Sequence, residues 1–327
     1  MVASVSERLG VLVMAYGTPR SLDEVEAYYT DIRRGRPPPD LLEELTARYR
    51  AIGGRSPLLE ITSAQARGIE ERLGVRAYIG QKHAAPFISD AIEKMRGDHV
   101  ERAVGLVLAP HYSSMSVGDY AHRAERAAAE LSWNGKLDII ESWHLEPGYL
   151  ELLEERVLTA RAQLPEGSRD GATVVFSAHS LPERILASGD PYPAQLAETA
   201  GAVAARAGLE SWRVAWQSAG RTAEPWLGPD ILEVIVELAD ARGPGSAGSQ
   251  HARGTGSAGS QTQGAPGIIV CPCGFVSDHL EVLYDIDIEA ARLAAKLDMP
   301  FVRTASPNDD PKFLDALAAV AARRLHL

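Results

Sequence analysis

Several groups of side chains in this sequence have types and spacings that suit chemistry. His179 follows the apolar run ATVVFSA and precedes SLPERI, so its imidazole falls at the end of a predicted strand. Imidazole titrates near neutral pH and also binds metal ions, which makes His179 a candidate for proton transfer or metal ligation. The alternative is a histidine that only caps a strand through a backbone hydrogen bond.

A series of carboxylates follows the apolar run GIIVC. Glu281, Asp285 and Glu289 are spaced four residues apart, and an α-helix would place all three on one face. A solvated acidic surface is the common explanation of such a pattern. The functional alternative is a set of oxygen ligands for a hard or borderline divalent cation, which the nearby Asp278 and His279 favour.

Arginines concentrate in residues 31–58 of a chain whose net charge is -11. Guanidinium groups bind carboxylates and phosphates through two parallel hydrogen bonds. The prolines and glycines around them indicate a shaped loop, so we predict an anion site here. The alternative is that some of these side chains only balance neighbouring carboxylates. The arginines are Arg33, Arg34, Arg36, Arg48, Arg50 and Arg55.

The chain has two cysteines, Cys271 and Cys273. They are too close for an ordinary disulfide, and an all-cysteine iron–sulfur cluster needs four ligands. We interpret them as small buried side chains at a strand end, which indicates a reducing compartment. The N-terminus lacks a signal-peptide pattern and no apolar run approaches the roughly 20 residues of a membrane span, so we predict a cytoplasmic location.

The elements that must position these groups are short apolar strands separated by amphipathic helices, for example at 63–73 and 120–131. This alternation is typical of parallel sheets covered on both faces. We predict an α/β fold with two halves, 1–150 and 151–327, and a final helix that packs across them. Ligands of such sheets bind at the carboxyl ends of the strands, so the residues after each run should meet in one cleft. The runs occupy residues 9–17, 76–80, 103–111, 137–142, 172–180, 212–218, 267–275 and 300–304.

Residues 241–266 interrupt this alternation with a Gly/Ser-rich tandem copy, ARGPGSAGSQ and ARGTGSAGSQ. Such sequence is typical of a flexible insertion. It contains two formal GxGxxG matches, but neither stands between a strand and a helix, so we predict no nucleotide site. The net negative charge repels phosphates and argues against nucleic acid as a main partner.

Eight motifs, in order along the chain, resemble the ferrochelatases, and most closely the coproporphyrin ferrochelatases of bacteria. The resemblance implies two similar Rossmann-like halves, each a four-stranded parallel sheet flanked by helices, with the tetrapyrrole in the cleft between them. The motifs are VMAYGTP (13–19), YYTDIRRGR (28–36), RYRAIGGRSPL (48–58), LAPHYSSMSVGDY (108–120), SAHSLPERI (177–185), DPYPAQL (190–196), WQSAGRTAEPWLGPD (216–230) and GFVSDHLEVLYDIDIE (274–289).

The resemblance also implies roles for individual residues. His179 and Glu281 match the residues that meet the metal on one face of the porphyrin, and Tyr16 resembles the tyrosine that faces it from the other side. Asp285 and Glu289 match the continuation of the acidic series, where a hydrated divalent cation such as Mg²⁺ can bind. The positions that hold the substrate's propionates are matched by Arg33, Arg48, Tyr49, Ser56 and Tyr120.

The expected reaction is therefore insertion of Fe²⁺ into coproporphyrin III, with no cofactor beyond the iron and with possible transfer of the product to a coproheme-processing enzyme. Cys271 and Cys273 resemble two of the four cysteines that hold a [2Fe-2S] cluster in some relatives, and we do not predict a cluster here. Two alternatives stay open: a protoporphyrin IX ferrochelatase, and a tetrapyrrole carrier without catalytic activity.

Overall fold

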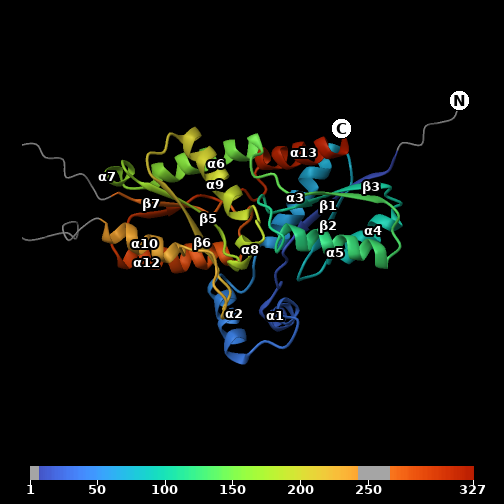
Figure 1. Cartoon of the computed structure of the whole chain (residues 1–327), viewed down its shortest axis with the longest axis horizontal. Helices are drawn as coiled ribbons and strands as arrows, with labels where there is room; N and C mark the ends of the chain where they lie inside the picture. The colour runs from blue at the N-terminus through green and yellow to red at the C-terminus, as the bar shows by residue number, and fades with distance from the viewer. Residues whose placement is uncertain (1–6, 242–265) are drawn as a thin grey trace, which may run out of the picture.

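Two four-stranded parallel sheets form the centre of the computed structural model, which describes residues 7–241 and 266–327 (Figure 1). Both sheets have the same strand order. In each, the second strand along the chain lies at one edge, and the first, third and fourth strands follow it in that order. All eight predicted strands and the predicted α/β class are confirmed. The first sheet runs β2 (Ala77–Gln81), β1 (Leu9–Ala15), β3 (Arg102–Val107) and β4 (Lys136–Ile140), and the second runs β6 (Trp212–Gln217), β5 (Thr173–His179), β7 (Ile268–Cys271) and β8 (Phe301–Arg303).

The central strands are apolar along their whole length because helices cover both of their faces. In β1 every residue after Leu9 is buried, and in β5 every residue before His179 is buried. His179 is therefore the point at which β5 leaves the core. At the edge of the first sheet, β4 alternates between exposed and half-buried residues before the buried Ile140, which is typical of a strand with one solvated face.

Helices cover each sheet in two layers (Figure 1). One layer runs over both sheets and contains α3 (Leu58–Leu73), α6 (Pro147–Gln163), α9 (Tyr192–Ala207) and α13 (Pro311–Leu325). On the opposite face, α4 (Ile88–Gly97) and α5 (Val117–Glu130) cover the first sheet, whereas α10 (Ile231–Asp240) and α12 (Ala291–Lys296) cover the second. Shorter elements are η1 (Leu22–Glu24), α7 (Glu166–Arg169), α8 (Arg184–Ala187), α11 (Leu280–Leu283) and the π-helix η2 (Asp285–Ala290).

Helix α13 joins the layers of the two halves. Its Phe313 ring lies 5.9 Å from the ring of Trp143 and 6.0 Å from that of Tyr149, and its Asp315 accepts from Arg72 of α3 at 2.5 Å. Side chains of both sheets belong to one apolar core as a result. A domain boundary near residue 150 stays a prediction, and that position falls inside α6.

Two helices project from the body between β1 and β2 (Figure 1): α1 (Val25–Arg33) and α2 (Pro39–Ala51). The prediction of a shaped loop in residues 31–58 is thus wrong for most of that segment. Pro39 stands at the first position of α2, where its missing N–H costs nothing, and the reversal comes after the helix, at Gly53 and Gly54, whose φ angles are +96° and +90°.

Residues 242–265, which include most of the predicted Gly/Ser-rich insertion and both GxGxxG matches, lie outside the described residues. In the part of the chain that is described, no helix combines the length and the apolar character needed to span a bilayer.

Candidate functional site

A cavity of about 270 Å³ is lined by residues that follow the carboxyl ends of strands in both sheets. This is the position predicted for a ligand of parallel sheets. Five of the predicted site residues line it: Tyr16 after β1, Tyr49 from α2, Tyr120 from α5, His179 at the end of β5 and Glu281 from α11. The other predicted residues, Arg33, Arg48, Ser56, Asp285 and Glu289, do not line this cavity.

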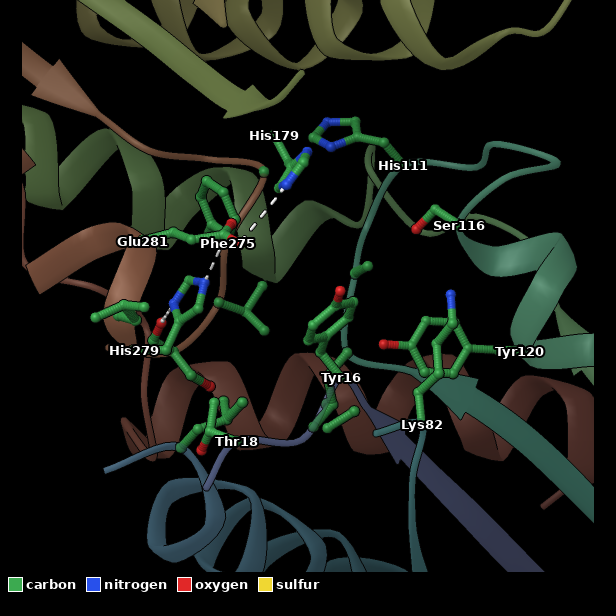
Figure 2. A pocket seen from close by; sticks show the side chains of 18 of the residues that line it. Tyr16, Thr18, Lys82, His111, Ser116, Tyr120, His179, Phe275, His279 and Glu281 are labelled. Atoms are coloured by element: carbon green, nitrogen blue, oxygen red, sulfur yellow. Dashed lines mark hydrogen bonds and ion pairs between the residues drawn. The ribbon is translucent and has the colours of Figure 1, made fainter. Parts of the chain in front are cut away.

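The carboxylate of Glu281 lies between two imidazoles (Figure 2). Its Oε1 is 3.6 Å from Nε2 of His179, and its Oε2 is 3.7 Å from Nε2 of His279. Each ring donates its Nδ1–H to a backbone carbonyl, His179 to that of Ser180 and His279 to that of Ser277 at 3.0 Å. In the neutral form of each ring, this hydrogen bond makes Nε2 the nitrogen that can accept a proton or bind a metal ion.

Hydrogen bonds from the second sheet hold Glu281 in place. Gln217 of β6 donates its Nε2 to the backbone carbonyl of Glu281 at 2.9 Å, and Ser177 of β5 donates to the Gln217 side chain at 2.8 Å. Burial alone would raise the pKa of Glu281, but His179 and then His279 outweigh it, and the pKa lies below its ordinary value. Glu281 is consequently ionised at neutral pH.

The opposite side of the cavity is aromatic and comes from the first sheet (Figure 2). Lys82, which follows β2, places its Nζ 5.9 Å from the centre of the Tyr16 ring and 5.1 Å from that of Tyr120, and it pairs with Asp119 at 2.5 Å. The ring of His83 lies 4.7 Å from the Tyr16 ring. Burial raises the pKa of Tyr16 well above its ordinary value, so the phenol stays neutral.

Asp285 lies behind the cavity and is 6% exposed. Arg48 pairs with it at 3.3 Å and also with Glu44 at 3.1 Å, and Ser218 donates to its second oxygen. Burial and then the charge of Glu281 raise the pKa of Asp285 to about 6. The arginine predicted to hold a propionate is thus bound to an internal carboxylate in this structure.

The predicted α-helical series of three carboxylates is not continuous. Glu281 belongs to α11, whereas Asp285 and Glu289 belong to the π-helix η2, whose wider turn shifts side chains four residues apart away from one line. Glu281 lines the cavity, Asp285 is buried behind it, and Glu289 is half-buried. Chain spacing alone could not distinguish these three environments.

Arg33 and Ser56 do not line the main cavity. Arg33 is exposed at the end of α1, where its guanidinium lies 5.6 Å from the centre of the Tyr29 ring. Ser56 is buried and lines a second cavity that adjoins the start of α3.

Cys271 and Cys273 are free and buried. Burial raises the pKa of the Cys271 thiol to about 12 and raises that of Cys273 as well, so neither thiol is a ready metal ligand. Within residues 7–241 and 266–327, no group of three or more His, Cys, Asp or Glu side chains is arranged to hold a metal ion.

Lys82, His111 and His279 also line the cavity, and none of them was predicted as a site residue. Lys82 comes directly after β2, so inspection of every strand end would have found it. His111 follows β3, and its Nε2 lies 2.9 Å from Thr199 Oγ1 while burial lowers its pKa to about 3. His279 was noted only as a neighbour of the acidic series, because the sequence does not show that α11 turns its ring toward Glu281.

Comparison with known proteins gives a consistent result over nearly the whole chain. Residues 8–244 and 258–325 match the family model described as Ferrochelatase. The chain is 45% identical to the coproporphyrin III ferrochelatase of Geobacillus kaustophilus, over 98% of this chain and 97% of that protein. It is 42% identical to the coproporphyrin III ferrochelatase of Bacillus subtilis, over 98% of each chain.

Among solved structures, SirB from Bacillus subtilis with Fe³⁺ is similar with a TM-score of 0.60 over 98% of both chains, at 12% identity. At that identity the likeness concerns the fold alone.

Proposed function

This chain belongs to the ferrochelatase family, and from that premise we propose that it inserts Fe²⁺ into coproporphyrin III, with His179 and Glu281 at the point of metal entry. The enzyme is a lyase. The observation that carries the residue assignment is the ionised Glu281 carboxylate held between the Nε2 atoms of His179 and His279.

The chemistry of metal insertion explains why such a group is needed. A free-base porphyrin carries two inner N–H groups, and both protons must leave as Fe²⁺ takes their place on four ring nitrogens. In its neutral form, each of the His179 and His279 rings has Nε2 as its proton acceptor, so the two rings can accept these two protons. Glu281 lies within 4 Å of both rings and stabilises the positive charge that each imidazole then gains.

The same three side chains suit the incoming metal ion. Imidazole nitrogen and carboxylate oxygen are both ligands of borderline divalent cations such as Fe²⁺. A ligand that holds the ion beside the ring removes much of the entropic barrier to its transfer. All three side chains line the cavity, and we assign His179 and Glu281 to this contact because they match the family's metal-site residues. We assign His279 to proton acceptance and to the orientation of Glu281.

The aromatic side of the cavity would hold the macrocycle. Tyr16 lies across the cavity from Glu281, so a flat ring between them would meet the metal-binding side chains on one face and a neutral phenol on the other (Figure 2). Apolar side chains such as Leu108, Leu181 and Val276 complete the lining and exclude water from the ring.

The choice of coproporphyrin III rests on the relatives named above and on the carboxylate-binding side chains around the cavity. We infer that Arg33, Arg48, Tyr49, Ser56 and Tyr120 contact the substrate's propionates. Arg48 is paired with Asp285 and Glu44, so binding of a propionate would exchange one carboxylate partner for another.

The remaining parts of the proposal concern ions, partners and location. Arg48 and Ser218 occupy both oxygens of Asp285, and a Mg²⁺ ion shared by Asp285 and Glu289 would have to displace Arg48, so our proposal contains no ion besides Fe²⁺. We further propose that the coproheme product passes to a coproheme-processing enzyme in the cytoplasm.

An anaerobic assay with Fe²⁺ tests the proposal, with loss of free-base porphyrin fluorescence as the signal. The wild-type protein should consume coproporphyrin III faster than protoporphyrin IX. His179→Ala should abolish metal insertion but still bind coproporphyrin, as measured by fluorescence without iron. Near-normal turnover by this variant would refute the assignment of His179, and porphyrin binding without insertion by the wild type would favour the tetrapyrrole carrier.

A further inference from the structure

The segment that carries His279 and Glu281 is too short to hold its shape by its own hydrogen bonds. Helix α11 has four residues, and the π-helix η2 that follows it has six. Helices of this length are marginal in water, because the first turn orders several residues for one hydrogen bond, and π-helices are rare. Contacts from outside the segment must therefore set the position of Glu281. The hydrogen bond from Gln217 is one of them, and a second group comes from the end of β8.

Arg303, the last residue of β8, joins the two ends of this segment. Its Nε and Nη2 donate to the two carboxylate oxygens of Asp287 in η2, at 2.6 Å and 2.9 Å. Its Nη1 lies 3.3 Å from Oδ1 of Asp278, the residue before His279. The Arg303 side chain is 15% exposed, and within residues 7–241 and 266–327 it is the only cation paired with either carboxylate. A planar guanidinium can hold two carboxylates in this way, whereas the single ammonium of lysine cannot.

The loop after β8 fixes Asp278 more firmly. Ser306 donates its hydroxyl to Oδ1 of Asp278 at 2.7 Å and accepts from Nη1 of Arg303 at 3.2 Å. Asn308 donates its Nδ2 to Oδ2 of Asp278 at 2.9 Å, and its Oδ1 accepts from the Asp278 N–H at 2.8 Å. Arg303, Ser306 and Asn308 therefore form one network with Asp278, and partly buried networks of this kind are rigid when their groups are paired. A change at Arg303 would displace Asp278 and, through the backbone, His279.

Neither Arg303 nor its two carboxylate partners line the main cavity, so Arg303 acts on the site only through other residues. We propose that Arg303 is a positioning residue that fixes Asp278 and Asp287 relative to each other and so keeps the Glu281 carboxylate beside the imidazoles. This inference rests on the proposed function and deepens it, because it concerns the same site. A misplacement of about 1 Å at a reacting group can lower a rate about 100-fold, so the fixed ends of the segment matter for metal insertion.

Arg303→Lys tests the proposal, because it keeps the positive charge and removes the planar fork. In the anaerobic assay at saturating coproporphyrin III, its kcat should fall about 10- to 100-fold. The Kd for coproporphyrin III without iron should stay within about twofold, since the aromatic side of the cavity comes from the first sheet. Amide hydrogen exchange in residues 279–290 of the folded variant should be faster than in the wild type, because local opening is no longer opposed at both ends.

Two further variants separate positioning from folding. Asp287→Asn alters one arm of the contact at a side chain that is 35% exposed, so the chain should still fold, and kcat should fall at least about threefold. Arg303→Lys combined with Glu281→Gln should be no more than about threefold slower than Glu281→Gln alone, because residues that act through one group are not additive. Fully multiplied losses would show that Arg303 does not act through Glu281.

Arg72→Lys is the matched control. Arg72 is 25% exposed, pairs with Asp315 at 2.5 Å and donates to the backbone carbonyls of Gly68 and Pro311, so it joins α3 to α13 away from the metal-entry segment. It should lose stability in urea denaturation but keep kcat within about twofold of the wild-type value.

An equal fall in kcat in this control would overturn the proposal, as would wild-type kcat in both Arg303→Lys and Asp287→Asn. If Arg303→Lys did not fold, the kcat of Asp287→Asn would decide the question. If the wild-type protein inserted no iron, the proposed function itself would fail, so the two failures are distinguishable.

Discussion

Replacement of Glu281 by glutamine is the sharpest test of the catalytic arrangement. The change keeps the size of the side chain but removes the charge that faces His179 at 3.6 Å and His279 at 3.7 Å. A pair of unit charges about 4 Å apart is worth about 4 kcal/mol at an effective dielectric constant of about 20. The Glu281 side chain is 27% exposed, so solvent screening reduces this value, and we take about 2 kcal/mol as the lower bound.

These bounds correspond to a fall in kcat of between about 30-fold and about 900-fold. The anaerobic fluorescence assay at saturating coproporphyrin III measures this fall, and binding without iron should change by less than about threefold. Glu198→Gln is the control, because Glu198 forms the same kind of carboxylate–imidazole pair, 2.8 Å from Nε2 of His144, but does not line the cavity. A kcat for Glu281→Gln within threefold of the wild-type value would refute our account of proton acceptance.

Three further predictions concern stability and the cysteines. Burial and the charge of Glu281 raise the pKa of Asp285 from 3.8 to about 6. The folded protein therefore binds a proton on the Asp285 carboxylate more tightly than the unfolded chain does, and its free energy of unfolding falls as the pH rises from about 4 through 6. Relative to wild type, Asp285→Asn should therefore gain up to about 3 kcal/mol in free energy of unfolding between about pH 4 and pH 7, measured by urea denaturation; a pH-independent difference would contradict this. A Cβ at Gly274 would lie 2.3 Å from Cβ of Ala178, so Gly274→Ala should cost about 1 to 3 kcal/mol in urea denaturation, and an unchanged midpoint would be inconsistent with the close contact. The raised thiol pKa values predict that a disulfide reagent such as DTNB labels neither cysteine in the native protein but labels both after unfolding, and that freshly purified protein lacks acid-labile sulfide; labelling of the folded protein would show the burial to be incorrect.

Much of the fold could be predicted because its local signals agree with its global structure. Strands such as β1 and β5 are continuous apolar runs, and such a run indicates a strand whose two faces are both buried under helices. Helices between them have clear boundaries, for example the left-handed Gly74 after α3 and the Asp230 capping box that begins α10. The arginine-rich segment was less predictable, because a proline at the first position of a helix and a proline in a loop look alike in sequence.

The site was predictable where a side chain stands at a strand end. His179 could be placed at the mouth of the cleft from the apolar run before it, since parallel strands of one sheet end at the same edge. Lys82 and His111 follow the same rule. Glu281 was harder, because α11 and the π-helix η2 interrupt the α-helical spacing on which the series of three carboxylates was predicted.

By itself, the sequence determined the α/β class, the eight strands, the strand ends that carry site residues and the family motifs. These depend on local periodicity and on residues adjacent in the chain. Only the tertiary structure decided which charged groups meet. Arg48 and Asp285 are 237 residues apart yet form an ion pair, and His179 at the end of β5 meets Glu281 and His279, which follow β7. Such contacts depend on how distant elements pack, which no local pattern encodes.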